Sequence, residues 1–292
     1  MPETFRFTLG SHSCLAIRDD VSRYPIAMFL TNLAKDVYEP LLREQRPEEE
    51  KTTQEVELPY TCLFIDSGHR RVLVDTGIGT YGSPGKLLSL LRGEGIESEA
   101  IDTVVLSHGH PDHVGGSLNE AGKPAFSNAR YVMFRKEWDY WTSNPSLAEL
   151  PVDESFKNMM RDCAQKNLTG IQSQIDLVEP GTEVAPGIRA IPAFGHSPGH
   201  MALEILSNGQ KLLFIADAMV LPLHLEFPET IGVTDHVPVE VVATRISLLE
   251  KAAREKCLVS TSHFPFPGIG YVVPKAGRWR WQGMEVVRSL GI

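Results

Sequence analysis

Three histidines and one aspartate lie within a stretch of six residues, directly after a short apolar segment. The segment Thr103–Leu106 is apolar and β-branched, which is typical of a buried strand. The motif that follows is His108-Gly-His110-Pro-Asp112-His113. Imidazole and carboxylate groups are ligands that zinc and related first-row ions prefer. Because a loop on a rigid strand end can aim its side chains into a cleft, the motif predicts a metal site.

The spacing within this motif divides its four side chains into two pairs. His108 and His110 alternate with a glycine, so in extended backbone they point the same way. Asp112 and His113 are adjacent and must diverge. One pair can therefore serve one metal, and the other pair a second metal beside it. The alternative is a histidine-rich surface loop, which leaves unexplained why three of the ten histidines follow a buried strand.

Three later apolar segments also end in candidate ligands. These ligands are His196 and His200 in Gly-His-Ser-Pro-Gly-His, then Asp217, then His263. A single histidine or aspartate at a strand end is more often structural. Three such ends, added to the first motif, complete two coordination spheres.

Asp75 ends the strand expected over residues 71–74 and is followed by Thr-Gly. Such an aspartate often serves only the chemistry of a turn. A buried carboxylate that orients metal-binding histidines is an equally good interpretation, because the turn lies just upstream of the histidine motif.

The composition is that of an ordinary soluble enzyme of 292 residues, with 42% hydrophobic and 22% charged residues. The net charge of −9 and the scattered basic residues argue against a nucleic-acid-binding surface. The four cysteines show no paired spacing, so we expect free thiols. The N-terminal residues show neither a signal peptide nor a membrane span, so we expect a cytoplasmic protein without membrane contact.

Short strands and turns recur in both halves of the chain. Hairpins are predicted over 5–17 and 58–74, and several more strands over 175–216. No linker rich in Pro, Gly or Ser separates the halves. We therefore expect an α/β (α+β) fold in a single domain, 1–292, with two sheets face to face and helices outside. Residues 1–57 would form an N-terminal extension with a hairpin, and its polar run over 43–57 is either a solvated loop or a flap.

Helices are expected over 84–91, 137–141, 152–167 and 238–256, with the third on the surface. The second contains the most aromatic patch of the chain. Its rings are either core or the wall of an apolar substrate pocket. We expect Trp138 and Trp141, together with Phe194, to line such a pocket.

The combined ligand motifs resemble those of the metallo-β-lactamase-fold hydrolases, over about Leu58–Tyr271. Asp75-Thr-Gly matches the upstream aspartate motif of that family. The segment Ser262–Gly270 is similar to the methyl parathion hydrolase branch, and quorum-quenching lactonases and glyoxalase II share the core motif. The resemblance implies an αββα four-layer sandwich, which agrees with the expected strands and helices.

The resemblance also implies a role for each ligand. The first metal would be bound by His108, His110 and His196, the second by Asp112, His113 and His263, with Asp217 bridging the two. Asp75 would orient the histidines, and His200 would shape the loop without binding metal. The implied cofactors are two divalent metal ions, zinc before manganese, iron or cobalt.

The activity implied is that of a dinuclear hydrolase that uses a metal-bridging hydroxide on a small-molecule substrate. Lactones or carboxylic esters come first and phosphotriesters second. Asp112 and Asp217 are the expected catalytic carboxylates, with Asp112 handling the proton passed to the leaving group. The alternatives are a mononuclear iron oxygenase-like enzyme and a non-catalytic binding protein of the same fold. A homodimer is possible on this sequence.

Two departures from the family patterns matter for the substrate. Lactonases of the best-known branch carry a tyrosine shortly after the bridging aspartate, whereas Asp217 is followed by Ala-Met-Val. Any hydroxyl group that assists the reaction must therefore come from elsewhere in the chain. The chain after His263 is too short for the glutathione-binding region of glyoxalase II.

Overall fold

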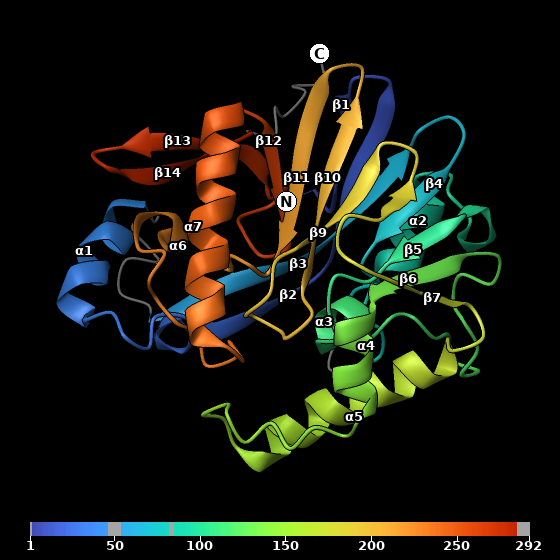
Figure 1. Cartoon of the computed structure of the whole chain (residues 1–292), viewed down its shortest axis with the longest axis horizontal. Helices are drawn as coiled ribbons and strands as arrows, with labels where there is room; N and C mark the ends of the chain where they lie inside the picture. The colour runs from blue at the N-terminus through green and yellow to red at the C-terminus, as the bar shows by residue number, and fades with distance from the viewer. Residues whose placement is uncertain (1, 46–53, 82–84, 285–292) are drawn as a thin grey trace.

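Two seven-stranded sheets lie face to face, and helices cover their outer faces (Figure 1). The computed structural model describes residues 2–45, 54–81 and 85–284. Strands β1 to β7 form one sheet in sequence order, and β14 to β8 form the other. Each half of the chain therefore builds one sheet, and the predicted αββα sandwich is confirmed.

The first sheet begins with antiparallel pairing and continues with parallel pairing. Its strands are β1 (Thr4–Leu9), β2 (His12–Pro25), β3 (Glu55–Asp66), β4 (Arg71–Val74), β5 (Thr103–Val105), β6 (Arg130–Phe134) and β7 (Ile175–Val178). Strands β1 to β4 are antiparallel, and β4 to β7 are parallel. The carboxyl ends of parallel strands meet at one edge, so the loops after β4 and β5 lie together.

The second sheet contains one parallel pair, β11 with β12, which α7 connects. Its strands are β8 (Glu183–Ala185), β9 (Ile188–Pro192), β10 (Met201–Ser207), β11 (Gln210–Ala216), β12 (Leu258–Thr261), β13 (Ile269–Lys275) and β14 (Arg278–Gly283). The parallel pairing brings the carboxyl ends of β11 and β12 to the same edge.

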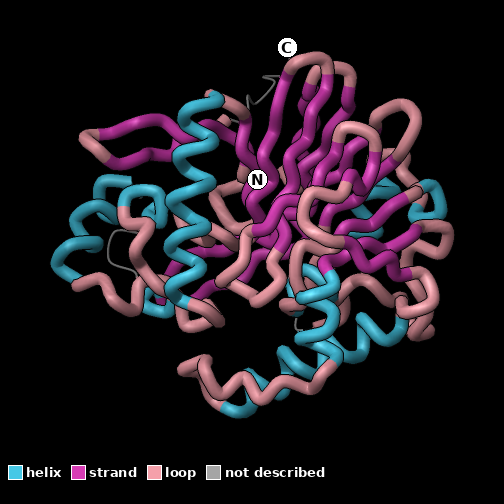
Figure 2. The backbone as a smooth tube through the Cα atoms, viewed as in Figure 1, coloured by secondary structure: helices cyan, strands magenta, loops and turns pink. Residues whose placement is uncertain are grey.

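The helices lie outside the strands (Figure 2). They are α1 (Lys35–Gln45), α2 (Leu87–Gly93), α3 (Pro111–Val114), α4 (Arg135–Thr142), α5 (Glu154–Gly170), α6 (Leu223–Glu226) and α7 (Pro238–Glu255), with 3₁₀ turns at Ile26–Met28 and Ser98–Ala100. Helix α7 has proline in its first turn, where no intrahelical N–H is needed. Of the helices in the described part of the chain, none is long and apolar enough to cross a membrane.

The strands near the middle of the sandwich bury side chains on both faces. On β3, Leu63 and Ile65 face the layer between the sheets, and Cys62 and Phe64 face the helices on the other side. This alternation follows from the two-residue period of a strand. Each buried aliphatic or aromatic side chain stabilises the fold by roughly 1.5–3 kcal/mol.

The expected surface position of residues 152–167 agrees with the structure, in which α5 is an amphipathic helix on the outer side of the first sheet (Figure 1). This segment forms most of α5, and one face of that helix is buried, including Met160, Cys163 and Leu168. Although polar residues are frequent in α5, its buried apolar residues form a stripe that packs on the first sheet. Part of the predicted flap, residues 46–53, lies outside the described residues. The single-domain organisation stays a prediction.

Candidate metal centre

The candidate ligands gather where the loops leaving five strands meet. Ser107 and His108 follow β5, and Pro111 starts α3 so that Asp112 and His113 lie in its only turn. Gly116 lets this turn approach the loop after β4 closely: a Cβ there would lie 2.1 Å from the carbonyl oxygen of Thr76. Glycine at position 116 is therefore required by the close packing of the two loops.

One group of ligands consists of three buried histidines. The ligand atoms of His108, His110 and His196 all lie within 4.8 Å of one another. His110 Nδ1 and His196 Nε2 are 3.1 Å apart. His108 and His110 come from the first sheet, and His196 comes from the loop between β9 and β10 of the second.

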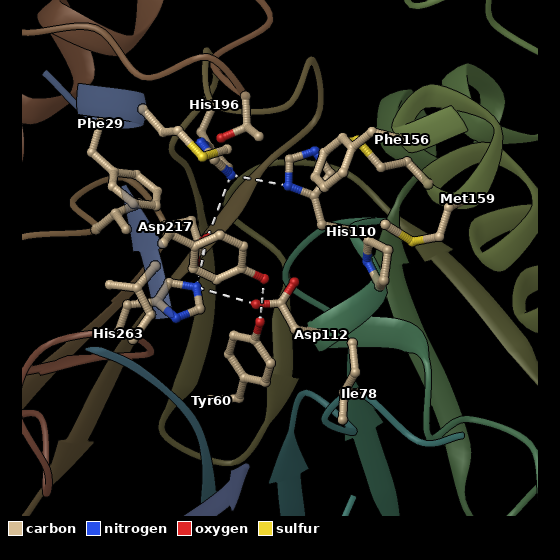
Figure 3. A pocket seen from close by; sticks show the side chains of 17 residues that line it. Phe29, Tyr60, Ile78, His110, Asp112, Phe156, Met159, His196, Asp217 and His263 are labelled. Carbon is tan, nitrogen blue, oxygen red and sulfur yellow. Dashed lines mark hydrogen bonds and ion pairs between the residues drawn. The ribbon is translucent and has the colours of Figure 1, made fainter. Parts of the chain in front are cut away.

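A second group contains two aspartates and two histidines. Asp112, His113, Asp217 and His263 also have ligand atoms within 4.8 Å of one another. Asp217 Oδ2 lies 2.8 Å from His263 Nε2, and Asp112 Oδ2 lies 3.3 Å from the same nitrogen (Figure 3). Asp217 Oδ1 lies 3.2 Å from His113 Nε2.

Asp217 joins the two groups. Its Oδ2 atom also lies 3.4 Å from His196 Nε2, which belongs to the three-histidine group. One carboxylate therefore faces ligand atoms of both groups, which is the arrangement that a bridging ligand requires.

The two groups differ in charge. Burial lowers the pKa of His108 and of His110 well below the usual value, which favours neutral imidazoles. Burial also lowers the pKa of His113, but Asp217 and Asp112 outweigh it and raise that pKa well above the usual value. His108 and His110 of the first group are thus neutral imidazoles, whereas His113 of the second group is paired with carboxylates.

Most of these histidines contact a supporting residue through the ring nitrogen that does not face the other ligands. The pairs are His113 Nδ1 with Asp75 Oδ2 (2.8 Å), His196 Nδ1 with Asp235 Oδ1 (2.8 Å), His110 Nε2 with His236 Nε2 (3.2 Å) and His263 Nδ1 with the Pro59 carbonyl oxygen (2.9 Å). Such partners fix the ring orientation of metal-binding histidines and the nitrogen that each presents.

The donor set fits two divalent first-row cations. His108 Nε2, His113 Nε2 and Asp217 Oδ1 are buried polar atoms of the two groups that make no hydrogen bond to a described residue, although the last two lie 3.2 Å apart as an ion pair. Buried polar atoms are normally hydrogen-bonded, so atoms without a partner need another explanation. Imidazole nitrogen and carboxylate oxygen together suit zinc, manganese, iron or cobalt.

Asp75 and His200 lie beside the ligand groups and belong to neither. Asp75 accepts hydrogen bonds from the backbone N–H of Ser107 (2.7 Å) and contacts His113, so it ties the first histidine loop to the end of β4. His200 Nε2 accepts a hydrogen bond from the backbone N–H of Asp217 (3.2 Å). Burial lowers the pKa of His200 to about 3, which keeps it a neutral acceptor.

Sequence reasoning missed the residues that support His196 and His110 from behind. Asp235 and His236 lie in an irregular segment before α7, where no periodic pattern draws attention. Asp235 also pairs with the buried Arg245 of α7 (3.2 Å), and His236 pairs with Glu149 (2.8 Å). The available signal was the adjacent Asp-His pair, the same residue types in the same order as in the first motif.

A cavity opens above the ligand groups. Its floor includes His110, Asp112, His196, Asp217 and His263 (Figure 3). The remaining lining is largely apolar or aromatic: Tyr24, Met28, Phe29, Leu58, Tyr60, Ile78, Pro111, Phe156, Met159, Met160, Val220 and Thr234. A polar floor with apolar walls is the usual form of a small-molecule site.

The predicted pocket residues Trp138, Trp141 and Phe194 are not among the residues that line this cavity. Trp141 is fully buried beneath the histidine loop, where a Cβ on Gly109 would lie 2.3 Å from its ring. Trp138 of α4 is partly buried and packs against the core, and Phe194 packs against Phe134 with ring centroids 6.1 Å apart. The aromatic patch of the sequence marks core.

Two tyrosines from the first sheet bring hydroxyl groups into the cavity instead. Tyr24 lies at the end of β2 and Tyr60 in β3, and their hydroxyl oxygens are 2.6 Å apart. The hydroxyl of Tyr60 points toward Asp112 (Figure 3). Burial, followed by the charge of Asp112, raises the pKa of Tyr60, so its phenol stays protonated.

Two solved structures share this arrangement of elements. One is AidC, described as a dizinc quorum-quenching lactonase in complex with a product, with a TM-score of 0.88, 23% identity and 97% of each chain covered. Another is a hydrolase of the β-lactamase superfamily, AbOPH, with a TM-score of 0.88, 24% identity and 98% of each chain covered. At these identities the likeness shows the fold.

Sequence relatives include N-acyl homoserine lactonases. One from Bacillus cereus is 24% identical over 179 residues, which cover 54% of this chain and 62% of the relative. AiiA from Bacillus thuringiensis subsp. kurstaki is 26% identical over 181 residues, which cover 54% of this chain and 63% of the relative. The chain thus spans less than two thirds of the length of these relatives.

The family profile described as the metallo-beta-lactamase superfamily matches residues 56–263. This range contains β3 to β12 and all the candidate ligands. Because the match covers well over half of the sequence, the chain belongs to the metallo-beta-lactamase superfamily.

Proposed function

We propose that this protein is a dinuclear metal-dependent hydrolase that opens lactones or carboxylic esters carrying an apolar group. The observation that carries the proposal is the pair of adjacent ligand groups, joined by Asp217, on the floor of an apolar cavity. Their roles follow the two-group geometry. His108, His110 and His196 would hold one ion, Asp112, His113 and His263 would hold the other, and Asp217 would serve both.

Two bound cations supply a nucleophile from water at neutral pH and polarise the oxygen of the scissile group. Within the chain, Asp112 is the carboxylate best placed to move a proton. Its side chain is 18% exposed toward the cavity, whereas that of Asp217 is 6% exposed. Asp112 can therefore reach the leaving oxygen, while Asp217 stays beneath it.

The paired hydroxyls of Tyr24 and Tyr60 are neutral donors for the substrate. The two hydroxyl oxygens lie 2.6 Å apart, so one of the two hydroxyl protons forms the hydrogen bond between the tyrosines. The second proton can be donated to a substrate oxygen, where charge develops during the reaction. The pair thus offers, from β2 and β3, a donor that the segment after Asp217 lacks.

The cavity walls favour an apolar substituent. Met28, Phe29, Phe156 and Met159 face the space above the ligands. Methionine side chains adapt to apolar groups of varied shape. Several relatives are named N-acyl homoserine lactonases, which supports a lactone ring with an acyl chain as the substrate class, and the dizinc relative supports zinc as the metal.

The experiment that tests this function measures metal content and hydrolysis on the same preparation. Protein purified without chelator or added metal should contain about two equivalents of divalent metal. Rates on an acyl homoserine lactone, an aryl ester and a phosphotriester should rank in that order, vanish with chelator and return with zinc. One equivalent of iron without hydrolysis would instead favour an oxygenase-like enzyme. Intact metal without turnover on any of the three would favour a binding protein.

A further inference from the structure

Glu137 is a fully buried carboxylate that accepts four hydrogen bonds. Its Oε1 atom accepts from the backbone N–H of Gly109 (2.8 Å), the indole N–H of Trp141 (2.7 Å) and the hydroxyl of Ser197. Its Oε2 atom accepts from the backbone N–H of Gly199 (2.7 Å). All four partners are donors, which suits an ionised carboxylate.

Three of these four donors come from the two loops that carry the three-histidine group, and the fourth, Trp141, lies in α4 itself. Gly109 lies between His108 and His110, and Ser197 and Gly199 lie between His196 and His200. Glu137 itself belongs to α4, which follows β6 of the first sheet. One carboxylate on a helix therefore joins a loop of the first sheet to a loop of the second.

The backbone of both loops is fitted against α4. A Cβ on Gly109 would lie 2.3 Å from the ring of Trp141, and a Cβ on Gly199 would lie 2.3 Å from the backbone nitrogen of Glu137. Glycine at these two positions allows each N–H to reach the carboxylate. The contacts thus depend on particular residues in three separate segments.

No ion pair links Glu137 to a cation among the described residues. Burial raises the pKa of Glu137, and its hydrogen bonds with Ser197, Gly109, Trp141 and Gly199 oppose that effect. A buried carboxylate held only by hydrogen bonds is costly to keep unless each bond is made. Its position is therefore unlike that of Asp75 and Asp235, which each contact one histidine directly.

We propose that Glu137 is a positioning residue that clamps the loops 107–113 and 195–200 together and thereby sets the distance between His110 and His196. The inference rests on the proposed dinuclear function for its consequence, which is tight binding of metal at the three-histidine group. Glu137 acts through the loops and contacts none of the ligand atoms in the structure.

The clamp can be tested first without metal, by NMR measurement of amide hydrogen exchange in the metal-free protein. In wild type, the amides of Gly109 and Gly199 should be protected. In Glu137→Leu, both should exchange at least about tenfold faster, since both lose their acceptor. In Glu137→Gln, the side-chain oxygen should occupy the position of Oε1, which accepts three hydrogen bonds, and the NH₂ group should occupy the position of Oε2. Gly199 would then lose its acceptor, so only the Gly199 amide should exchange faster. Unchanged exchange at both glycines in Glu137→Leu would overturn the clamp.

The second measurement is metal titration of the same variants. We expect one of two metal equivalents to bind about 10–100-fold more weakly in Glu137→Gln, with the other unchanged. Tyr131→Phe is the matched control, because it removes a buried hydroxyl bonded to Ser117 (3.1 Å) and Phe126 (3.2 Å) without touching the clamp. Equal weakening in this control would mean that Glu137 acts only through general stability.

The two measurements separate the clamp from the proposed function. If Glu137→Leu does not fold, Glu137→Gln and Ser197→Ala still report on Gly199 and its loop. If wild type binds no metal and the exchange pattern holds, the clamp stands and the proposed function fails. If wild type binds two metals and neither measurement responds to Glu137, the clamp fails and the proposed function stands.

Discussion

The floor and the walls of the cavity are built on different principles. The floor consists of charged and ligand-type side chains on loops, and most of its histidines have a second partner behind them. The walls consist largely of apolar side chains, such as Phe29, which follows the 3₁₀ turn Ile26–Met28, and Met159 of α5. The difference indicates that the floor determines the reaction and the walls select the substrate.

The largest loss should come from the centre of the floor. Asp217→Ala removes the carboxylate that faces both ligand groups, so we expect activity to fall at least about 1000-fold and metal content to drop. Elemental analysis and initial rates check both effects. Normal turnover in this variant would refute the two-metal arrangement.

A smaller loss should come from the hydroxyl pair at the border between floor and walls. Tyr60→Phe should lower kcat by about 100-fold, because one donor to the developing charge is removed, and should leave metal content unchanged. Kinetics on the lactone check this, with Tyr24→Phe as the matched variant that keeps the hydroxyl facing Asp112. An unchanged kcat in Tyr60→Phe would mean that the pair only supports the fold.

Substitutions in the walls should change substrate binding and leave the rate of the chemical step unchanged. Met159→Ala should raise KM for a long-chain substrate by about tenfold, because roughly 1.5 kcal/mol of apolar burial is lost, while kcat stays the same. A short-chain substrate serves as the control and should respond less. A fall in kcat without a change in KM would place Met159 with the floor.

The smallest effect on activity is expected at Trp138, which lies outside the cavity lining. Trp138→Ala should leave KM and substrate preference unchanged and should destabilise the protein by roughly 2–3 kcal/mol, because a packed ring is lost. Thermal denaturation and the same substrate panel measure the two effects. A shifted substrate preference would return this residue to the walls.

The sequence predicted the floor because its signals are local. Each ligand directly follows an apolar strand segment, so type and position could be recognised within a few residues of His108, Asp217 or His263. The two sheets could be predicted for the same reason. Strand, turn and ligand appear together in one short stretch.

The walls and the supporting residues could not be predicted in this way. Tyr24 and Tyr60 meet only because β2 pairs with β3 across a long register. Glu137 appears in the sequence as one acidic residue in an aromatic helix. Of its four hydrogen-bond donors, only Trp141 is near it in the chain. Partners of this kind are created by tertiary packing, for which no periodic pattern exists.

Both ligand groups draw on both halves of the chain. In each group, residues after β5 meet residues after β9, β11 or β12. A fragment that ends before β8 and one that begins there would each hold an incomplete set. In the proposed dinuclear enzyme, metal binding would therefore be linked thermodynamically to the docking of the two halves, with a gain of RT ln(1 + [L]/Kd) for each bound ion. Occupancy of the two proposed sites would then set how strongly the two halves of the chain stay associated.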